Sequence, residues 1–260
     1  MSTFESFADL IGNPKISFLG DPMASRLLIT TQGAYQTFYA PFDHVNRDAK
    51  VVICGITPGK QQAMNALEEA RKRLLNGDSP EVAQQMAKKT ASFSGKMRSS
   101  LVEMLNYIGV DELLGITNCV DLFGAHSHLA HFTSALRNPV FRNGKDYGGT
   151  PSMVKQPALL EQIDLVLGAE LLSLGPDCIY VPLGEEVSKA FTHLEAKSVI
   201  QSAQVLHGVP HPSQNNIERI LYFLGKKDRN SLSDRTNHLK IDERKWETLQ
   251  KVERLRAKLS

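Results

Sequence analysis

The stretch KVVICGITPGK, residues 50–60, joins an uninterrupted apolar run to a turn that contains glycine and proline. A short, continuous apolar run is typical of a strand buried on both faces, as in a parallel sheet. The residues that follow, 61–75, have the apolar spacing of a helix. This stretch therefore predicts a buried strand, a tight turn and a helix, which is the repeating unit of an α/β layer structure.

The same alternation continues along the chain. Further strands are predicted at residues 113–120, 177–183 and 202–209, and helices at residues 96–108, 157–174 and 185–194. The pattern predicts a three-layer α/β/α sandwich with a central four-stranded parallel sheet. Residues 26–42 are expected to add an edge strand or a hairpin.

We expect residues 1–225 to form one α/β domain and residues 226–260 to form a basic helical extension packed on it. Residues 225–260 hold eleven Lys/Arg and six Asp/Glu, a net charge of +5 within a chain of net charge +2. This excess is compatible with binding to nucleic acid, although the charge taken alone favours a solvated helix face. Apolar residues at 249, 252, 255 and 259 form the helical stripe that would dock on the domain or, less favourably, on a second chain.

Composition excludes several classes of protein. No apolar run approaches the ~18 residues that a membrane span needs, and the N-terminus lacks the pattern of a secretory signal. The expected location is therefore the cytoplasm, in association with the nucleoid. The cysteines Cys54, Cys119 and Cys178 form no C-x-x-C pair, so we expect buried thiols and neither disulfides nor a zinc site.

The turn GITPGK (55–60) does not fit a phosphate-binding loop. Three residues separate its glycines where that motif has four, and Gln61 follows Lys60 where the motif has Ser or Thr. No nucleotide cofactor is expected. Gly55 and Gly59 allow a ligand close to the backbone, and Pro58 stiffens the loop.

The segment GAHSHLAH (124–131) places His126, His128 and His131 close together in sequence. Such a run could bind a metal ion, but no carboxylate or cysteine nearby completes a ligand set. Contact with a polar ligand, or simple exposure, is the favoured interpretation. We expect no metal and no organic cofactor.

Three motifs follow predicted strands in a fixed order: GITPG (55–59), ITN (116–118) and HPSQNN (211–216). Ligands of open α/β sheets bind at the carboxyl ends of the strands. Together the three motifs resemble the uracil-DNA glycosylase superfamily over roughly residues 45–225. The segment SFSGKMRSSLVEML (92–105) is similar to that family's F-x-G…L stretch.

The resemblance implies a monofunctional DNA glycosylase that hydrolyses the N-glycosidic bond of a flipped-out uracil or 5-modified pyrimidine and leaves an abasic site. It implies that His211 donates a hydrogen bond to the pyrimidine O2 and that Asn118 reads the base edge. It also implies that Phe93 stacks on the base and that Ser213 holds a flanking phosphate. The other residues that the resemblance places at the site are Gly55 and Gly59 for the base, and Pro58, Lys60, Asn215 and Asn216 for DNA.

Three positions depart from the family pattern. Thr57 stands where many relatives have Asp or Asn to position or activate the attacking water, and a hydroxyl is no base near neutrality. Asn215 is short and polar where several relatives insert a plug into the DNA stack. Gly59 replaces a tyrosine that bars 5-substituted pyrimidines in one branch, so the wall beside C5 is open to a bulkier base.

The expected partner is therefore DNA, single- or double-stranded, with the chain favoured as a monomer. Lys60, Lys96, Arg98 and the tail are candidate phosphate contacts. A DNA-binding or sensor protein that kept the fold and lost catalysis is the alternative, which Thr57 and Asn215 favour. A nucleoside hydrolase for small molecules is a third possibility with little support.

Overall fold

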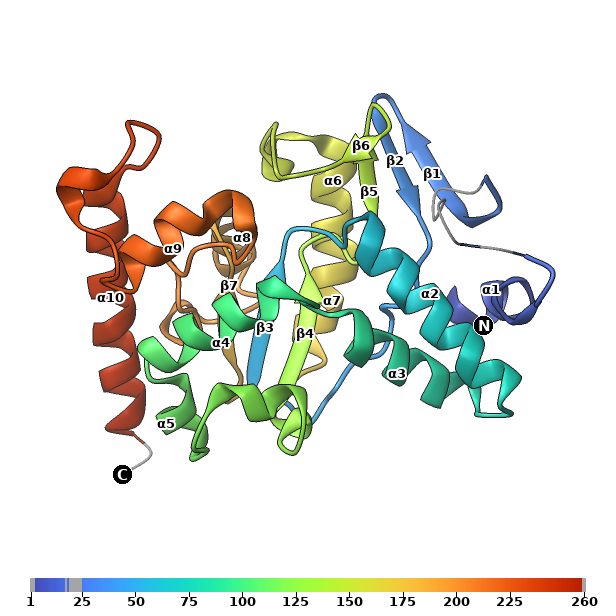
Figure 1. The fold of residues 1–260 in the computed structure, drawn as a ribbon, viewed down its shortest axis with the longest axis horizontal. Helices are drawn as coiled ribbons and strands as arrows, with labels where there is room; N and C mark the ends of the chain where they lie inside the picture. The colour runs from blue at the N-terminus through green and yellow to red at the C-terminus, as the bar shows by residue number, and fades with distance from the viewer. Residues whose placement is uncertain (1–2, 17, 19–24, 259–260) are drawn as a thin grey trace. The chain divides into compact units, whose positions relative to one another are not determined.

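The computed structural model describes residues 3–16, 18 and 25–258 (Figure 1). The chain divides into two compact units, and each is described by itself. The first unit contains residues 1–45, 56–94 and 132–170, and the second contains residues 46–55, 95–131 and 171–260.

The first unit contains three packed helices, α1 (Thr3–Gly12), α2 (Lys60–Leu75) and α3 (Pro80–Ala91). Helices α2 and α3 lie side by side (Figure 1), and each buries small alanine side chains in the shared core. These alanines are Ala63, Ala66, Ala70, Ala83, Ala87 and Ala91. Small side chains let two helix backbones approach closely, and aromatic residues from the sheet, from α1 and from the segment after β2 share this core.

The sheet of this unit is antiparallel, in the order β1-β2-β5-β6. Its strands are β1 (Leu28–Gln32), β2 (Tyr35–Phe38), β5 (Val140–Arg142) and β6 (Lys145–Asp146). The predicted N-terminal hairpin is present as β1 and β2. The β5–β6 turn consists of Asn143 and Gly144, with φ of 50° and 74°. Two residues of positive φ are what a tight hairpin requires, and Asn-Gly is the pair that supplies them best.

The second unit contains β3 (Val51–Gly55) and β7 (Ile179–Pro182), paired in parallel with Val51 opposite Ile179. All nine of their residues are buried, as the continuous apolar runs predicted. Its helices are α4 (Lys96–Tyr107), α5 (Val110–Leu114), α8 (Glu185–Ala196), α9 (Ile217–Phe223) and α10 (His238–Arg256). Helix α10 packs on α5 and α9.

The prediction of a central four-stranded parallel sheet is wrong. The parallel sheet has three strands in the order β4-β3-β7, and a second, antiparallel sheet accompanies it. Residues 113–120 form no strand, because Gly115 closes α5 in the left-handed conformation (φ 64°) and Asn118 begins a 3-10 helix. The run 202–209 contributes only an isolated parallel bridge between Val205 and Tyr180.

The parallel strand that sequence reasoning missed is β4 (Ala130–Ser134, AHFTS). Its His131 and Thr133 are buried although polar, so hydrophobic pattern alone gave no strand signal. The apolar residues of 113–122 explain the opposite error: Leu113, Cys119 and Leu122 are buried at intervals of six and three residues, both multiples of the three-residue 3-10 turn.

Shorter elements complete the fold. The predicted helix 157–174 is α6 (Pro157–Gln162), a π-helical turn (Ile163–Leu167) and α7 (Gly168–Leu172). The 3-10 helices are Ser25–Leu27, Cys119–Phe123, Ser127–Leu129, Met153–Lys155, Ser202–Gln204, Gln214–Asn216 and Arg229–Ser231. Cys54, Cys119 and Cys178 are buried thiols, as expected. Within the described ranges, no helix has the length and apolar character needed to cross a bilayer.

Candidate active site

His211 lies at the carboxyl edge of the parallel strands in the second unit. Backbone hydrogen bonds join Leu183 N to Cys54 O, and Gly184 N to Val209 O, at 2.9 and 2.8 Å. The ends of β3 and β7 and the segment that leads into His211 therefore share one edge. Gly184 has a φ of 85°, and a Cβ there would lie 3.1 Å from the Cβ of His211. Glycine is thus needed both for the backbone conformation and for the close approach.

The His211 ring is neutral at physiological pH and has a defined tautomer. Burial lowers the pKa of His211 to about 4, because a charged imidazolium would lose its hydration. The backbone N–H of Ser213 donates to Nδ1 at 3.3 Å. A neutral ring that accepts at Nδ1 carries its proton on Nε2. Nε2–H has no hydrogen-bond partner among the described residues, so it is a donor available to a ligand.

The remaining residues of HPSQNN form a chain of hydrogen bonds. The Asn216 side-chain amide donates to Ser213 Oγ at 3.0 Å, and Asn216 Oδ1 accepts from Arg219 at 2.7 Å. The backbone N–H of Ser213 is occupied by His211, so its hydroxyl hydrogen is what remains for a phosphate. Asn215 is exposed within the 3-10 helix Gln214–Asn216.

Thr57 belongs to the first unit and joins two loops. Its hydroxyl donates to Asn138 O at 2.9 Å and accepts from the backbone N–H of Val140 at 3.1 Å. The hydroxyl hydrogen is therefore already engaged in a hydrogen bond, and one lone pair of the oxygen can still accept a hydrogen bond from a water molecule. Thr57 can orient such a water but cannot take a proton from it. Pro58 beside it is buried.

Gly59 and Lys60 begin α2 against a carboxylate that sequence reasoning missed. Gly59 N donates to Gln62 Oε1, and Lys60 N donates to Asp146 Oδ1, both at 3.1 Å. This end of the helix, which could otherwise bind a phosphate, is thus capped by the chain itself. The Lys60 side chain is exposed. The Asn-Gly turn at 143–144 was the signal that could have revealed the hairpin carrying Asp146.

Phe93 belongs to the first unit and is buried, with 6% of its surface exposed. It packs edge-on against Phe132 with ring centroids 5.9 Å apart. Its φ of 48° is rare for a bulky residue, so the surrounding structure must hold it in place. A ring fixed in this way has the rigidity of a stacking platform, but it is also a core contact.

Asn118 does not end a strand, contrary to the motif-based expectation. Its Oδ1 caps a 3-10 helix by accepting from Val120 N at 2.8 Å, and it also accepts from the Asn106 amide at 3.1 Å. The acceptor that would read a base edge therefore has two internal donors. Asparagine is a common helix-capping residue, and capping of the 3-10 helix accounts for the position of Asn118.

The histidine run does not converge on one point. His131 is buried and accepts from the backbone N–H of Asn46, while the rings of His126 and His128 lie 6.0 Å apart. Across residues 3–16, 18 and 25–258, no group of three or more His, Cys, Asp or Glu side chains is arranged around a common metal position.

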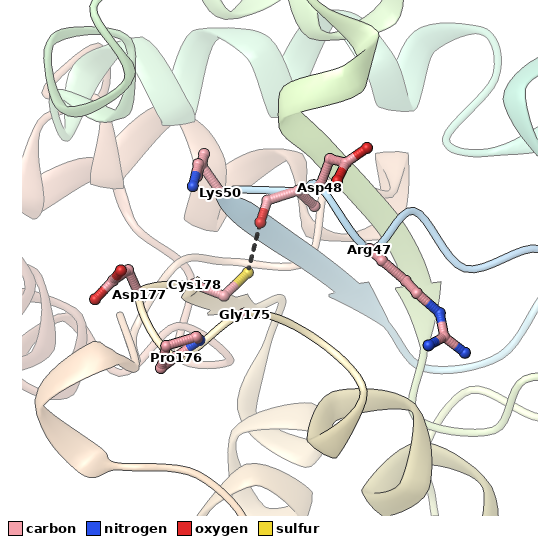
Figure 2. Close-up of a pocket in the computed structure, with 8 residues that line it drawn as sticks. Arg47, Asp48, Lys50, Gly175, Pro176, Asp177 and Cys178 are labelled. Atoms are coloured by element: carbon pink, nitrogen blue, oxygen red, sulfur yellow. Dashed lines mark hydrogen bonds between the residues drawn. The ribbon is translucent and has the colours of Figure 1, made fainter.

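A pocket of about 270 Å³ opens at the amino-terminal ends of β3 and β7 (Figure 2). It is lined by Arg47, Asp48, Ala49, Lys50, Gly175, Pro176, Asp177 and Cys178. The Cys178 thiol donates to Ala49 O, and burial raises its pKa to about 12, so it is no nucleophile. The pocket's mixed charges favour no single class of ligand.

Several basic residues of the tail pair with carboxylates of the second unit. Glu185 accepts from Lys240 at 3.0 Å and from Arg244 at 2.7 Å, and Arg256 lies 2.6 Å from Glu112. Further pairs join Lys226 to Glu103 and Lys227 to Glu218. Arg98, another candidate phosphate contact, lies over the Phe123 ring at 4.4 Å, whereas Lys96 is exposed.

One known protein is similar to the chain over most of its length. No family model and no solved structure matches the chain. The chain is 33% identical over 223 residues to the uncharacterized protein YoxB of Bacillus subtilis (strain 168), and the match covers 83% of this chain and 87% of YoxB. Similarity of this extent along both chains indicates common ancestry. The chain therefore belongs to the same protein family as YoxB.

Proposed function

We propose that the chain is a monofunctional DNA glycosylase that hydrolyses the N-glycosidic bond of a flipped-out uracil or 5-modified pyrimidine. The observation that carries the proposal is His211, a neutral imidazole with its proton on Nε2 at the carboxyl edge of a parallel sheet. The motif resemblance supplies the reaction, and His211 supplies the chemical group that the reaction needs.

The chemistry requires stabilisation of charge. When the glycosidic bond breaks, its electron pair leaves with the base, and positive charge develops on the sugar. Nε2–H of His211 donates to O2 of the departing base, which spreads the negative charge without a prior protonation step. Water then bonds to C1′ and releases a proton to the base or solvent, leaving an abasic site. The resemblance assigns the orientation of this water to position 57, where the Thr57 hydroxyl keeps one lone pair for it, and the sugar cation needs only a weak nucleophile.

In the second unit, the Ser213 hydroxyl binds a phosphate beside the flipped nucleotide in this proposal. The resemblance assigns a DNA contact to Lys60 and stacking on the base to Phe93, both in the first unit. The short, exposed Asn215 favours single-stranded or weakly paired substrates, because it is too small to fill the vacated stack.

The test is excision from oligonucleotides. Single- and double-stranded DNA carrying uracil or a 5-modified pyrimidine is incubated with the protein, and abasic sites are then cleaved with alkali. We expect strand breaks whose single-turnover rate falls about 100- to 1000-fold in His211→Ala, the usual cost of losing one such donor. His128→Ala, which removes an exposed histidine from the second unit, is the matched control and should retain the rate.

Thr57 favours a second candidate, a DNA-binding sensor without catalysis. Its hydroxyl proton is committed to Asn138 O, and no carboxylate occupies its position. That candidate predicts salt-sensitive DNA binding with no strand breaks on any base. Such a result, obtained with folded protein, would replace the glycosylase proposal.

A further inference from the structure

Gly208 lies three residues before His211 and lets helix α10 pack directly on the backbone. Its φ of 104° is a conformation that residues with a side chain rarely adopt. A Cβ at this position would lie 2.7 Å from the Cβ of Arg244 and 3.0 Å from Arg244 O. The backbone of α10 around Arg244 is therefore in close contact with the segment that leads into His211.

Hydrogen bonds from α10 fix the same segment. Lys251 Nζ donates to Ser202 O at 2.8 Å and to Val205 O at 2.9 Å. The Thr248 hydroxyl donates to His207 O. Three main-chain carbonyls of this segment thus find their partners on one helix, which holds the segment against α10. The position of α10 and the position of the chain before His211 are therefore linked.

The Arg244 guanidinium extends from this contact to the first residue of α8. Its Nη1 lies 2.7 Å from Glu185 Oε2, and its Nη2 donates to Glu185 Oε1 at 3.5 Å. Lys240 also binds Glu185 Oε2, at 3.0 Å. Glu185 directly follows Gly184, where a Cβ would lie 3.1 Å from His211 Cβ. A guanidinium that binds both carboxylate oxygens fixes direction as well as distance, because its N–H groups form a planar fork.

We infer that Arg244 is a positioning residue for His211, because it connects the start of α8 to the segment that leads into the histidine. The two glycine backbones next to His211, at Gly184 and at Gly208, are then held at a fixed separation by one side chain. Without this connection the Gly184 turn can move away from His211, and water can reach the ring. All of these residues belong to the second unit. The effect on catalysis rests on the proposed function, whereas the effect on the His211 ring does not.

The first test measures the His211 ring itself. Nuclear magnetic resonance with isotope-labelled histidine gives the pKa and the tautomer of each ring, and the signal that disappears in His211→Gln belongs to His211. In Arg244→Gln we expect the pKa of His211 to rise by at least about 0.5, because water regains access to the charged form. Glu185→Ala should have the same effect. The double variant should add little to it, since both changes remove one pair.

Two further variants separate positioning from general stability. Arg256→Gln breaks the ion pair that joins the same helix to Glu112. It should lower the melting temperature and leave the pKa of His211 unchanged. Arg244→Lys keeps one charged donor for Glu185 and should preserve most of the wild-type behaviour. An unchanged pKa of His211 in folded Arg244→Gln, or an equal rise in Arg256→Gln, would overturn the inference.

The second test measures excision at saturating concentrations of the oligonucleotide on which the wild-type protein is fastest. We expect the single-turnover rate to fall about 10- to 100-fold in Arg244→Gln, because a misplaced group slows the chemical step. The dissociation constant for the oligonucleotide should change less than about twofold. A rise in the pKa of His211, without excision of any base by the wild-type protein, would overturn the glycosylase and retain the positioning role. Excision at an unchanged rate in Arg244→Gln would overturn only the role of Arg244. Neither excision nor a change in pKa would overturn both.

Discussion

The chemistry of His211 depends on its neighbours more than on its residue type. An exposed histidine is partly charged near neutrality, whereas burial and the Ser213 N–H keep this ring neutral with one defined donor. The sequence HPS indicated a functional histidine. It could not indicate the tautomer, because that depends on the backbone geometry two residues further along the chain.

The lowered pKa of His211 predicts a pH dependence of stability. Between pH 6.5, the ordinary histidine value, and about pH 4, the folded protein binds fewer protons than the unfolded chain. The free energy of unfolding should therefore rise with pH across this window. The contribution that comes from His211 is lost as the pH falls through the same window. Urea unfolding at several pH values should show a shallower dependence in His211→Gln. The same slope in wild type and variant would contradict the assignment, and His128→Gln serves as the control.

At the scale of elements, hydrogen bonds join the loop after β3 to the β5–β6 hairpin. The sequence predicted β3 and the following helix because their periodicity is clear. It could not predict that Thr57 would bind the start of β5, since the two are separated by more than eighty residues and no pattern connects them. The same holds for Asp146, whose contact with Lys60 N no pattern in the sequence predicts.

Thr57 should therefore contribute to stability whatever its catalytic role. Thr57→Val keeps the shape but leaves Val140 N–H and Asn138 O without their partner, which should lower the free energy of unfolding by about 1–3 kcal/mol. Thr57→Ser retains the hydroxyl and should lose much less. Chemical denaturation of the three proteins measures the difference. Equal stability of the valine and serine variants would mean that the hydroxyl bridge contributes nothing.

Glu218 on α9 is a second local source of stability, because its carboxylate accepts several hydrogen bonds. Hydrogen bonds from Ser233 and Thr236, and then from Lys227, lower its pKa to about 2. Because this value is below the ordinary 4.5, the interaction stabilises the fold above pH 4.5 and is lost as the pH falls towards 2.

Glu218→Gln should loosen the segment 228–237 that these bonds attach to α9. Amide hydrogen exchange at neutral pH should be faster in this segment and unchanged in the strands β3 and β7. Glu247→Gln on α10 removes an exposed carboxylate and is the control. Unchanged exchange in 228–237 would show that the segment is fixed by other contacts.

At the scale of the whole molecule, alternation of strands and helices predicted an α/β protein correctly and the sheet incorrectly. Continuous apolar runs identified β3 and β7, which are buried on both faces. The same rule misassigned residues 113–120, whose apolar spacing serves helical turns, and overlooked β4, which buries histidine and threonine. The apolar pattern of a sequence predicts which residues are buried. It did not predict the left-handed backbone conformation of Gly115, which makes this segment a turn and not a strand.

The tail illustrates the same limit for charge. Its net excess was compatible with contact with DNA but favoured a solvated helix face, and in the second unit Lys240 and Arg244 are paired with Glu185. We expect Lys240→Gln with Arg244→Gln to lower the melting temperature and leave the salt dependence of oligonucleotide binding unchanged. Lys60→Gln should instead reduce the slope of log affinity against log salt by about 0.7–1, one phosphate contact. A reduced slope in the tail variant would restore the tail as a DNA contact.

The three buried thiols give the molecule a built-in reporter of its own opening. Burial raises the pKa of Cys119 and Cys178 to about 12, and Cys54 lies within β3. A thiol reagent should therefore find no reactive group in the native protein and three in the unfolded chain. The labelling rate of each cysteine, followed by mass spectrometry, would time the opening of its surroundings without any engineered probe. Rapid labelling under native conditions would contradict the burial described above.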